Sequence, residues 1–255
     1  MRSNHRHEII VRFVRTDSPA DKTRIAGIQP LLSNEERETL SRFRSEQTRT
    51  DFAAAHALAR ATVGELGDCD PRELVFRPGK RGRLRVVRPW RARGIEFSLS
   101  HADGVALCAV TRECTIGADV ESQRFLGRDP MGVAAAVCSE REHATLRSLP
   151  QSLRAERVLA VWTLKEAVAQ AAGQGVQLSL SSINIDDVPT LGSGAGAFGV
   201  SVQAGDRSRW RLTSLRLAPH YVAAVAVPER FRNHVSLRFE EGNVGENLFR
   251  SWSMS

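Results

Sequence analysis

The stretch Ile116-Gly-Ala-Asp-Val-Glu121 predicts a β-strand whose two faces differ in chemistry. Residues two apart in a strand point the same way, so Gly117, Asp119 and Glu121 share one face, and the apolar residues between them share the other. Two carboxylates therefore lie on one surface, and Gly117 is expected to leave open space beside them. The strand is both part of an expected sheet and a candidate site.

Further along, Trp162-Thr-Leu-Lys-Glu-Ala167 lies in a periodic run, about Ser152 to Ala172, that predicts a long helix stopping at Gly173. Glu166 interrupts an apolar stripe of this helix. A buried carboxylate is costly without a partner, so Glu166 requires a metal, a lysine or a hydrogen-bond network. Lys165 lies on the neighbouring stripe and could reach a phosphate.

Asp119, Glu121 and Glu166 are the hard oxygen donors that Mg²⁺ prefers. This ion typically takes one or two carboxylates and completes its coordination with water and phosphate oxygens. We therefore expect one divalent metal ion to be shared by the strand and the helix. Each element read alone allows an ordinary alternative: two solvated acids on a sheet face, and an exposed lysine in the middle of a helix.

A second polar motif, Ser98-Leu-Ser-His101, closes the β run Ile95 to Leu99 and opens a polar turn. A histidine at a strand end can donate a hydrogen bond to a phosphate, although a lone histidine is more often structural. His101 is therefore a candidate phosphate contact.

The order of elements occurs twice along the chain. Ser33-Asn-Glu-Glu36 and Ser139-Glu-Arg-Glu142 are capping-box patterns, and each predicts the start of a helix. A longer helical run and then β runs follow both boxes. This internal similarity argues for two related α/β halves and against a solenoid, whose repeats are shorter.

We predict that the first half covers residues 1–122 and the second residues 123–228, with a shared ligand in the cleft between them. Residues 229–255 are polar and are expected to form a mobile tail, with one possible strand at Val235 to Phe239.

The composition is that of an ordinary globular protein: 42% of the 255 residues are hydrophobic and 25% are charged. No apolar run is long enough to span a membrane, and the amino end shows no signal-peptide pattern. The four cysteines lack metal or redox spacing and are expected to be buried thiols. These features predict a cytoplasmic protein.

The net charge of +7 comes mostly from arginine, since the only lysines are Lys22, Lys80 and Lys165. A positive field favours encounter with a negatively charged partner. The arginines are dispersed and are not interleaved with aromatic residues, so nucleic acid is not the expected partner.

Several motifs follow one another in a recognisable order: Gly79-Lys80, Ser98-Leu-Ser-His101, Ile116-Gly-Ala-Asp-Val-Glu121, Cys138-Ser-Glu-Arg-Glu142, and Trp162-Thr-Leu-Lys-Glu-Ala167 with Gly173-Gln-Gly175. This ordered set resembles the motifs of the Sfp-type 4′-phosphopantetheinyl transferases. The resemblance extends from about Leu32 to Val227.

The resemblance implies an α+β monomer with pseudo-twofold symmetry, in which each half carries a small antiparallel sheet and a long helix. It also implies a Mg²⁺-dependent enzyme that moves the phosphopantetheine arm of coenzyme A onto a serine of an apo acyl or peptidyl carrier protein and releases 3′,5′-ADP. Carrier proteins are usually acidic, which fits the basic charge of this chain.

By the same resemblance, Asp119, Glu121 and Glu166 would bind the metal. Glu166 would also be the general base, with Lys165 as an additional donor. The residues implied to contact coenzyme A are Lys80, Ser100, His101, Lys165 and, for the 3′-phosphate, Arg49, with Arg42 and Arg44 as rivals.

Three positions depart from the family pattern: Arg81 replaces a usual proline, and Gln170 and Gln174 replace usual lysines. These departures keep open an alternative in which a catalytically impaired relative binds coenzyme A or a carrier protein without turnover.

Overall fold

The computed structural model describes residues 7–79, 83–173, 179–185, 200–204, 208–231 and 235–241. The chain divides into two compact units, Met1–Cys114 with Asn233–Ser255, and Thr115–Arg232. The boundary therefore lies earlier than the one expected at residue 122. The strand β6 (Gly117–Ser122), which we assigned to the first half, is hydrogen-bonded into the sheet of the second unit, where Gly117 pairs with Ala226.

The first unit is built on a four-stranded sheet in the order β10-β1-β5-β4. Its strands are β1 (His7–Arg15), β4 (Glu96–Ala102), β5 (Val105–Thr111) and β10 (Val235–Glu241). The pairs β1–β5 and β4–β5 are antiparallel, whereas β10 runs parallel to β1. The expectation of a purely antiparallel sheet was therefore wrong for this unit, because β10 joins the free edge of β1 in the same direction.

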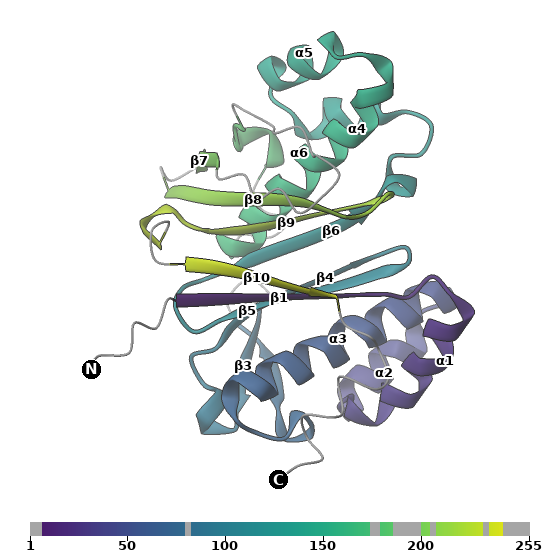
Figure 1. The fold of residues 1–255 in the computed structure, drawn as a ribbon, viewed down its shortest axis with the longest axis vertical. Coiled ribbons are helices and arrows are strands. Elements are labelled where there is room, and N and C mark those ends of the chain that lie inside the picture. The colour runs from purple at the N-terminus through teal and green to yellow at the C-terminus, as the bar shows by residue number, and fades with distance from the viewer. Residues whose placement is uncertain are drawn as a thin grey trace. The chain divides into compact units, whose positions relative to one another are not determined.

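The long helix α3 (Glu46–Gly67) lies along this sheet and contacts β4 and β5 (Figure 1). Its buried apolar side chains are mostly alanine, with Leu58 and Val63. The helix ends at Gly67, and Asp68 follows in a left-handed conformation with φ of 48°. The shorter elements of this unit are α1 (Pro19–Ile28), α2 (Asn34–Arg42), the hairpin β2 (Val75–Pro78) and β3 (Leu84–Arg88), and the 3-10 turns η1 (Gln29–Leu31), η2 (Pro71–Glu73) and η4 (Trp90–Ala92).

Strand β10 corrects the expectation of a mobile tail over residues 229–255. Its pairing with β1 extends from His7–Val235 to Phe13–Glu241. Three ion pairs join the strands, from Arg12 to Glu240 at 2.7 Å, from Arg238 to Glu8 at 3.3 Å and from Arg15 to Glu241 at 3.5 Å. The possible strand at Val235 to Phe239 is thus formed. Residues 242–255 lie outside the described residues.

The second unit carries an antiparallel sheet in the order β6-β9-β8-β7. Its other strands are β7 (Val200–Ala204), β8 (Ser208–Ala218) and β9 (Tyr221–Pro228), and its helices are α4 (Pro130–Val137), α5 (Glu140–Ser148) and α6 (Gln151–Ala171), with 3-10 turns η5 (Gln123–Leu126), η7 (Leu180–Ser182) and η8 (Glu229–Phe231). Helix α6 contacts β6 and β9 (Figure 1). Residues 174–178 lie outside the described residues, and Leu180 begins the turn η7.

Both predicted capping boxes are present, with Ser33 at the start of α2 and Ser139 at the start of α5. Each unit thus contains a capping-box helix, a long helix and a four-stranded sheet, and the α+β class is confirmed. All four cysteines are buried and free. Within the described ranges, no helix is both long and apolar enough to cross a membrane.

Candidate functional site

The centre of the candidate site is the crossing of β6 and α6. A side chain at Gly117 would put its Cβ 1.9 Å from the carbonyl oxygen of Ala167 and 2.5 Å from the backbone nitrogen of Ala171. The helix backbone therefore occupies the space that we expected to be open. Because alternate strand residues share a face, Asp119 and Glu121 lie on the side of β6 that α6 covers.

Three carboxylates belong to this strand and helix. Asp119 is buried, and Glu121 and Glu166 are half-buried. Burial raises the pKa of Glu121 to about 7, and the negative charge of Glu166 adds to this rise. Burial also raises the pKa of Glu166. Both carboxylates are thus partly removed from water, and the charge of Glu166 makes the ionised form of Glu121 less favourable.

A cation would offset this unfavourable charge interaction. Within the described part of the chain, however, no group of three or more His, Cys, Asp or Glu side chains is arranged to hold a metal ion. The three-carboxylate site expected from the sequence is thus not formed as a closed protein cage. The donor chemistry still fits Mg²⁺, which is often held by one or two carboxylates together with water and phosphate oxygens.

Glu166 occupies a more open surface than the helical pattern indicated. Trp162, Glu166 and Gln170 recur every fourth residue of α6, and all three are half-buried, whereas Ala169 is fully buried. The Trp162 ring packs on Phe125 of η5 with 4.6 Å between ring centroids. The carboxylate of Glu166 therefore lies on a partly accessible stripe with an aromatic pair one turn away.

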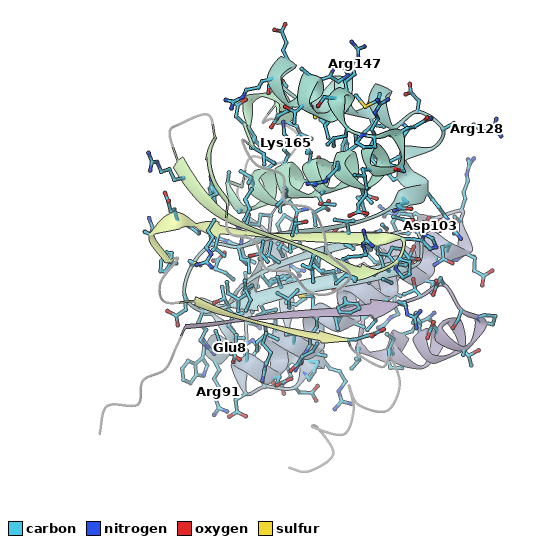
Figure 2. All side chains as sticks on the ribbon, turned by 45° about the horizontal axis from the view of Figure 1, so that its top comes forward. Glu8, Arg91, Asp103, Arg128, Arg147 and Lys165 are labelled. Carbon is cyan, nitrogen blue, oxygen red and sulfur yellow. The ribbon has the colours of Figure 1, made fainter. Side chains whose placement is uncertain are left out.

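Lys165, the residue directly before Glu166, lies in different surroundings from Glu166. Its side chain is fully buried, and its Nζ donates to Glu142 Oε2 at 2.6 Å and to the carbonyl oxygen of Val137 at 2.8 Å. Figure 2 shows Lys165 inside the helical part of the second unit. Adjacent helix residues point about 100° apart, so the two side chains face different surroundings.

This placement argues against a contact between Lys165 and a phosphate, and the role of Lys165 in catalysis stays a prediction. The other oxygen of its partner, Glu142 Oε1, accepts from the backbone N–H of Ile185 at 2.7 Å. A phosphate contact would break the ion pair and leave a buried carboxylate uncompensated, which is costly. The exposed-lysine alternative is excluded as well.

The first unit contains a matching cluster that sequence reasoning missed. Glu36 accepts from Arg60 Nε at 2.7 Å and lies 2.9 Å from His56 Nδ1. Glu36 and Glu142 hold the same position in their capping boxes, and their cationic partners follow 24 and 23 residues later, on α3 and α6. A basic residue in the long helix, 23 or 24 residues after the capping-box glutamate, was the sequence signal that could have predicted these ion pairs.

His101 lies at the end of β4 on the side of helix α3, where its ring meets the edge of Phe52 at 6.3 Å. Burial and the neighbouring His56 lower the pKa of His101 to about 4. The imidazole is therefore neutral at pH 7 and can donate one N–H, but it brings no positive charge. Ser100 precedes it in the strand and consequently points to the opposite face.

Of the remaining predicted contacts, Arg49 is described by the structure and Lys80 is not. Arg49 Nη1 donates to the carbonyl oxygens of Phe43 and Arg44, at 2.9 and 3.2 Å, and so stabilises the turn between α2 and α3. Lys80 lies outside the described residues, as does Arg81.

Taken by itself, this geometry defines an α+β protein with a pair of interacting carboxylates where a strand and a long helix cross. Residues 115–226, nearly all of the second unit, match the sequence model of the 4′-phosphopantetheinyl transferase superfamily. The second unit therefore resembles this superfamily of transferase enzymes, and the resemblance predicted from the motifs is confirmed.

Three curated relatives extend the likeness beyond the matched domain. The 4′-phosphopantetheinyl transferase HetI of Nostoc sp. is 29% identical over 220 residues, which cover 86% of this chain and 87% of that protein. The 4′-phosphopantetheinyl transferase psf-1 of Bacillus pumilus is 25% identical, over 65% of this chain and 68% of its own. The 4′-phosphopantetheinyl transferase gsp of Aneurinibacillus migulanus is 22% identical, over 68% and 70%.

Proposed function

We propose that this protein transfers the 4′-phosphopantetheine moiety of coenzyme A to a serine of an apo acyl or peptidyl carrier protein, giving the holo-carrier and 3′,5′-ADP. The superfamily match and the names of the relatives support the reaction class. The observation that carries the proposal is the pair formed by Glu121 and Glu166, two poorly hydrated carboxylates whose charges interact across the crossing of β6 and α6.

Glu166 is the residue we assign to proton transfer. In the reaction, the serine oxygen forms a bond to the β-phosphorus of coenzyme A, the bond from that phosphorus to the oxygen of 3′,5′-ADP breaks, and the serine proton must be accepted. A carboxylate whose pKa is raised by burial is a stronger base than one in water. Its position on a partly accessible stripe lets a hydroxyl approach.

Asp119, Glu121 and Glu166 are the residues that would hold Mg²⁺, in whichever subset the bound phosphates allow. When bound, this ion supplies positive charge that neutralises the pyrophosphate and the leaving group. The unfavourable effect of the Glu166 charge on ionised Glu121 supports this assignment, because a nearby cation would offset it.

The first unit is proposed to supply the contacts to coenzyme A. His101 would donate as a neutral imidazole, and Ser100, Lys80 and Arg49 remain candidates from the family resemblance. Lys165 is left out of this set, because its ammonium is engaged in the buried pair with Glu142.

We further propose that the protein acts as a cytoplasmic monomer. The repetition of one element order in the two units supports the two-half architecture that the resemblance implies. A single peak at the monomer mass in size-exclusion chromatography with light scattering is the expected result, and a stable dimer would contradict it.

The central experiment incubates the protein with coenzyme A, Mg²⁺ and a panel of apo-carriers and weighs each carrier by mass spectrometry. We expect a mass gain of one phosphopantetheine group. Glu166→Gln should lower the rate by at least about 100-fold, since it removes a base and a metal ligand. Glu140→Gln, an exposed acid of α5, is the matched control and should keep full activity.

No mass gain on any carrier would contradict the proposed transfer reaction. Equal activity of Glu166→Gln and Glu140→Gln would contradict the role assigned to Glu166. Omitting Mg²⁺ by chelation should abolish transfer in the same assay, and restoring the ion should recover it.

A second candidate function is binding of coenzyme A or a carrier without turnover. The burial of Lys165 together with Gln170 on the stripe of Glu166 favours it, because α6 then presents no lysine beside the carboxylates. Measurable coenzyme A affinity with no transfer to any carrier would establish this alternative.

A further inference from the structure

The turn η4 presents an exposed tryptophan on the first unit. Trp90 keeps 75% of its surface exposed, more than the other exposed large hydrophobic residues of the described chain, Phe125 at 41% and Leu153 at 39%. Tryptophan buries a large apolar area when it is covered, and it is enriched among the residues that dominate protein interfaces. An indole so fully open to water is a candidate anchor for a partner.

The turn that carries Trp90 is firmly held. Ala92 is fully buried, and it packs so closely on Gly67 that a Cβ added there would lie 3.0 Å from the Ala92 Cβ. Arg112 Nη2 donates to the carbonyl oxygens of Arg91 and Leu66, at 3.1 and 3.0 Å. The indole is therefore displayed by an ordered backbone, which lowers the entropy lost on binding.

The surroundings of Trp90 are strongly basic. Residues 83–93 contain five arginines and no acidic residue. Arg83 pairs with Glu96 at 2.9 Å, whereas Arg85, Arg88 and Arg91 are exposed and have no carboxylate partner among the described residues. These arginines leave positive charge uncompensated next to the indole.

Arg91 links the charge to the ring. Its guanidinium carbon lies 5.9 Å from the centroid of the Trp90 ring, and Figure 2 shows Arg91 at the margin of the unit. Tryptophan and arginine together are the commonest energetic centres of protein interfaces. We name the surface formed by Arg88, Trp90 and Arg91 the Trp90 turn.

We propose that the Trp90 turn is a docking surface for the acidic face of the carrier protein. This inference rests on the proposed function, which makes a carrier the macromolecular substrate. The chemistry required of the partner is an apolar depression that accepts the indole, bordered by Asp and Glu side chains that pair with Arg88 and Arg91. Charges at such a rim mainly steer and orient the encounter, while the buried aromatic supplies affinity.

A single-stranded nucleic acid is the competing occupant, since bases stack on aromatic rings beside basic residues. Such sites usually offer several aromatic rings to successive bases. Within residues 83–93, Trp90 is the only aromatic residue, and Arg91 already lies near its ring. The observations therefore favour an acidic protein.

The test compares Trp90→Ala and Arg91→Glu with Arg147→Glu, which makes the same charge change at an exposed position of α5. Binding of an apo acyl carrier protein is measured by calorimetry without coenzyme A or Mg²⁺, and the Michaelis constants for carrier and coenzyme A are measured in the transfer assay. We expect Trp90→Ala and Arg91→Glu each to weaken carrier binding by roughly 10-fold. The constant for coenzyme A and all values for Arg147→Glu should change less than about twofold.

Other outcomes distinguish a failure of the docking surface from a failure of the proposed transferase function. Normal carrier binding by Trp90→Ala, or an equal loss in Arg147→Glu, overturns the docking surface while leaving the transferase activity intact. Loss of single-stranded DNA binding in Trp90→Ala and Arg91→Glu, with carrier binding unchanged, also overturns it. Failure of the unaltered protein to modify any carrier overturns the proposed function instead, and the binding titration still reports on the surface.

Discussion

At the scale of single residues, Lys165 and Glu166 show how neighbours in one motif acquire different roles. Both belong to the same six-residue stretch, yet Lys165 is sealed in an ion pair and Glu166 lies on a partly open stripe. From the helical pattern alone we expected Glu166 to be the more buried of the two, because a lysine is rarely buried unless it is paired. Its partner, Glu142, is 23 residues away in the chain.

Lys165→Met is expected to destabilise the protein by about 3–5 kcal/mol, since it strands the buried carboxylate of Glu142. Thermal unfolding followed by circular dichroism measures the effect. The double variant Lys165→Met/Glu142→Leu should recover much of the loss, because both charges are then removed. A variant with normal stability and a weakened affinity for coenzyme A would instead return Lys165 to the phosphate site.

Glu121 gives a stability difference that depends on pH. Its pKa is about 7 in the folded protein and near 4.5 when unfolded, so the folded state binds more protons between these values and stability is lost as the pH rises through about 7. Glu121→Gln removes this loss. Without Mg²⁺, the variant should melt roughly 3 °C or more above the unaltered protein at pH 8, and the gap should close near pH 4.

Added Mg²⁺ is the control for that comparison. It should raise the melting temperature of the unaltered protein at pH 8 and have less effect on Glu121→Gln. A gap that is the same at both pH values would show that Glu121 does not titrate in this range.

At the scale of elements, the crossing of α6 over β6 determines the geometry of the site. The strand can approach the helix backbone because residue 117 has no side chain. The alternating pattern of β6 correctly placed Asp119 and Glu121 on one face, but it could not show that a helix covers that face. Packing between elements distant in sequence decides this, and no local pattern encodes it.

Gly117→Ala should therefore be strongly destabilising, by about 3 kcal/mol or more, because the new methyl group meets backbone atoms that cannot move aside cheaply. Denaturant unfolding measures the loss. Gly27→Ala is the matched control: Gly27 lies exposed in α1, a Cβ there meets nothing within 4 Å, and the change should be neutral or slightly stabilising. Similar stabilities for the two variants would contradict the close crossing.

At the scale of the whole molecule, the end of the chain belongs to the unit that contains its beginning. Asn233–Ser255 is grouped with Met1–Cys114, and β10 completes the edge of the first sheet. Polarity led us to expect a mobile tail, since the strand has a short, charged sequence. Its order comes from pairing with β1 and from ion pairs such as Arg12 with Glu240, 228 residues apart.

Deleting residues 233–255 should expose the edge of β1, lower the melting temperature by about 5 °C or more and promote aggregation. A variant that lacks only residues 242–255 keeps β10 and should melt close to the full chain. Equal melting temperatures for the two truncations would show that β10 adds nothing to the first unit.

The sequence by itself determined the local features of this protein. The capping boxes at Ser33 and Ser139, the long helices, most strands and the shared face of Asp119 and Glu121 follow from side-chain periodicity and from hydrogen bonds between near neighbours, and the ordered motifs indicated the family resemblance. Only the tertiary structure decided that Lys165 is buried, that α6 covers Gly117 and that β10 is a strand. The physical reason is that each of these depends on a partner far away in the chain, and burial and charge pairing act on whatever the fold brings together.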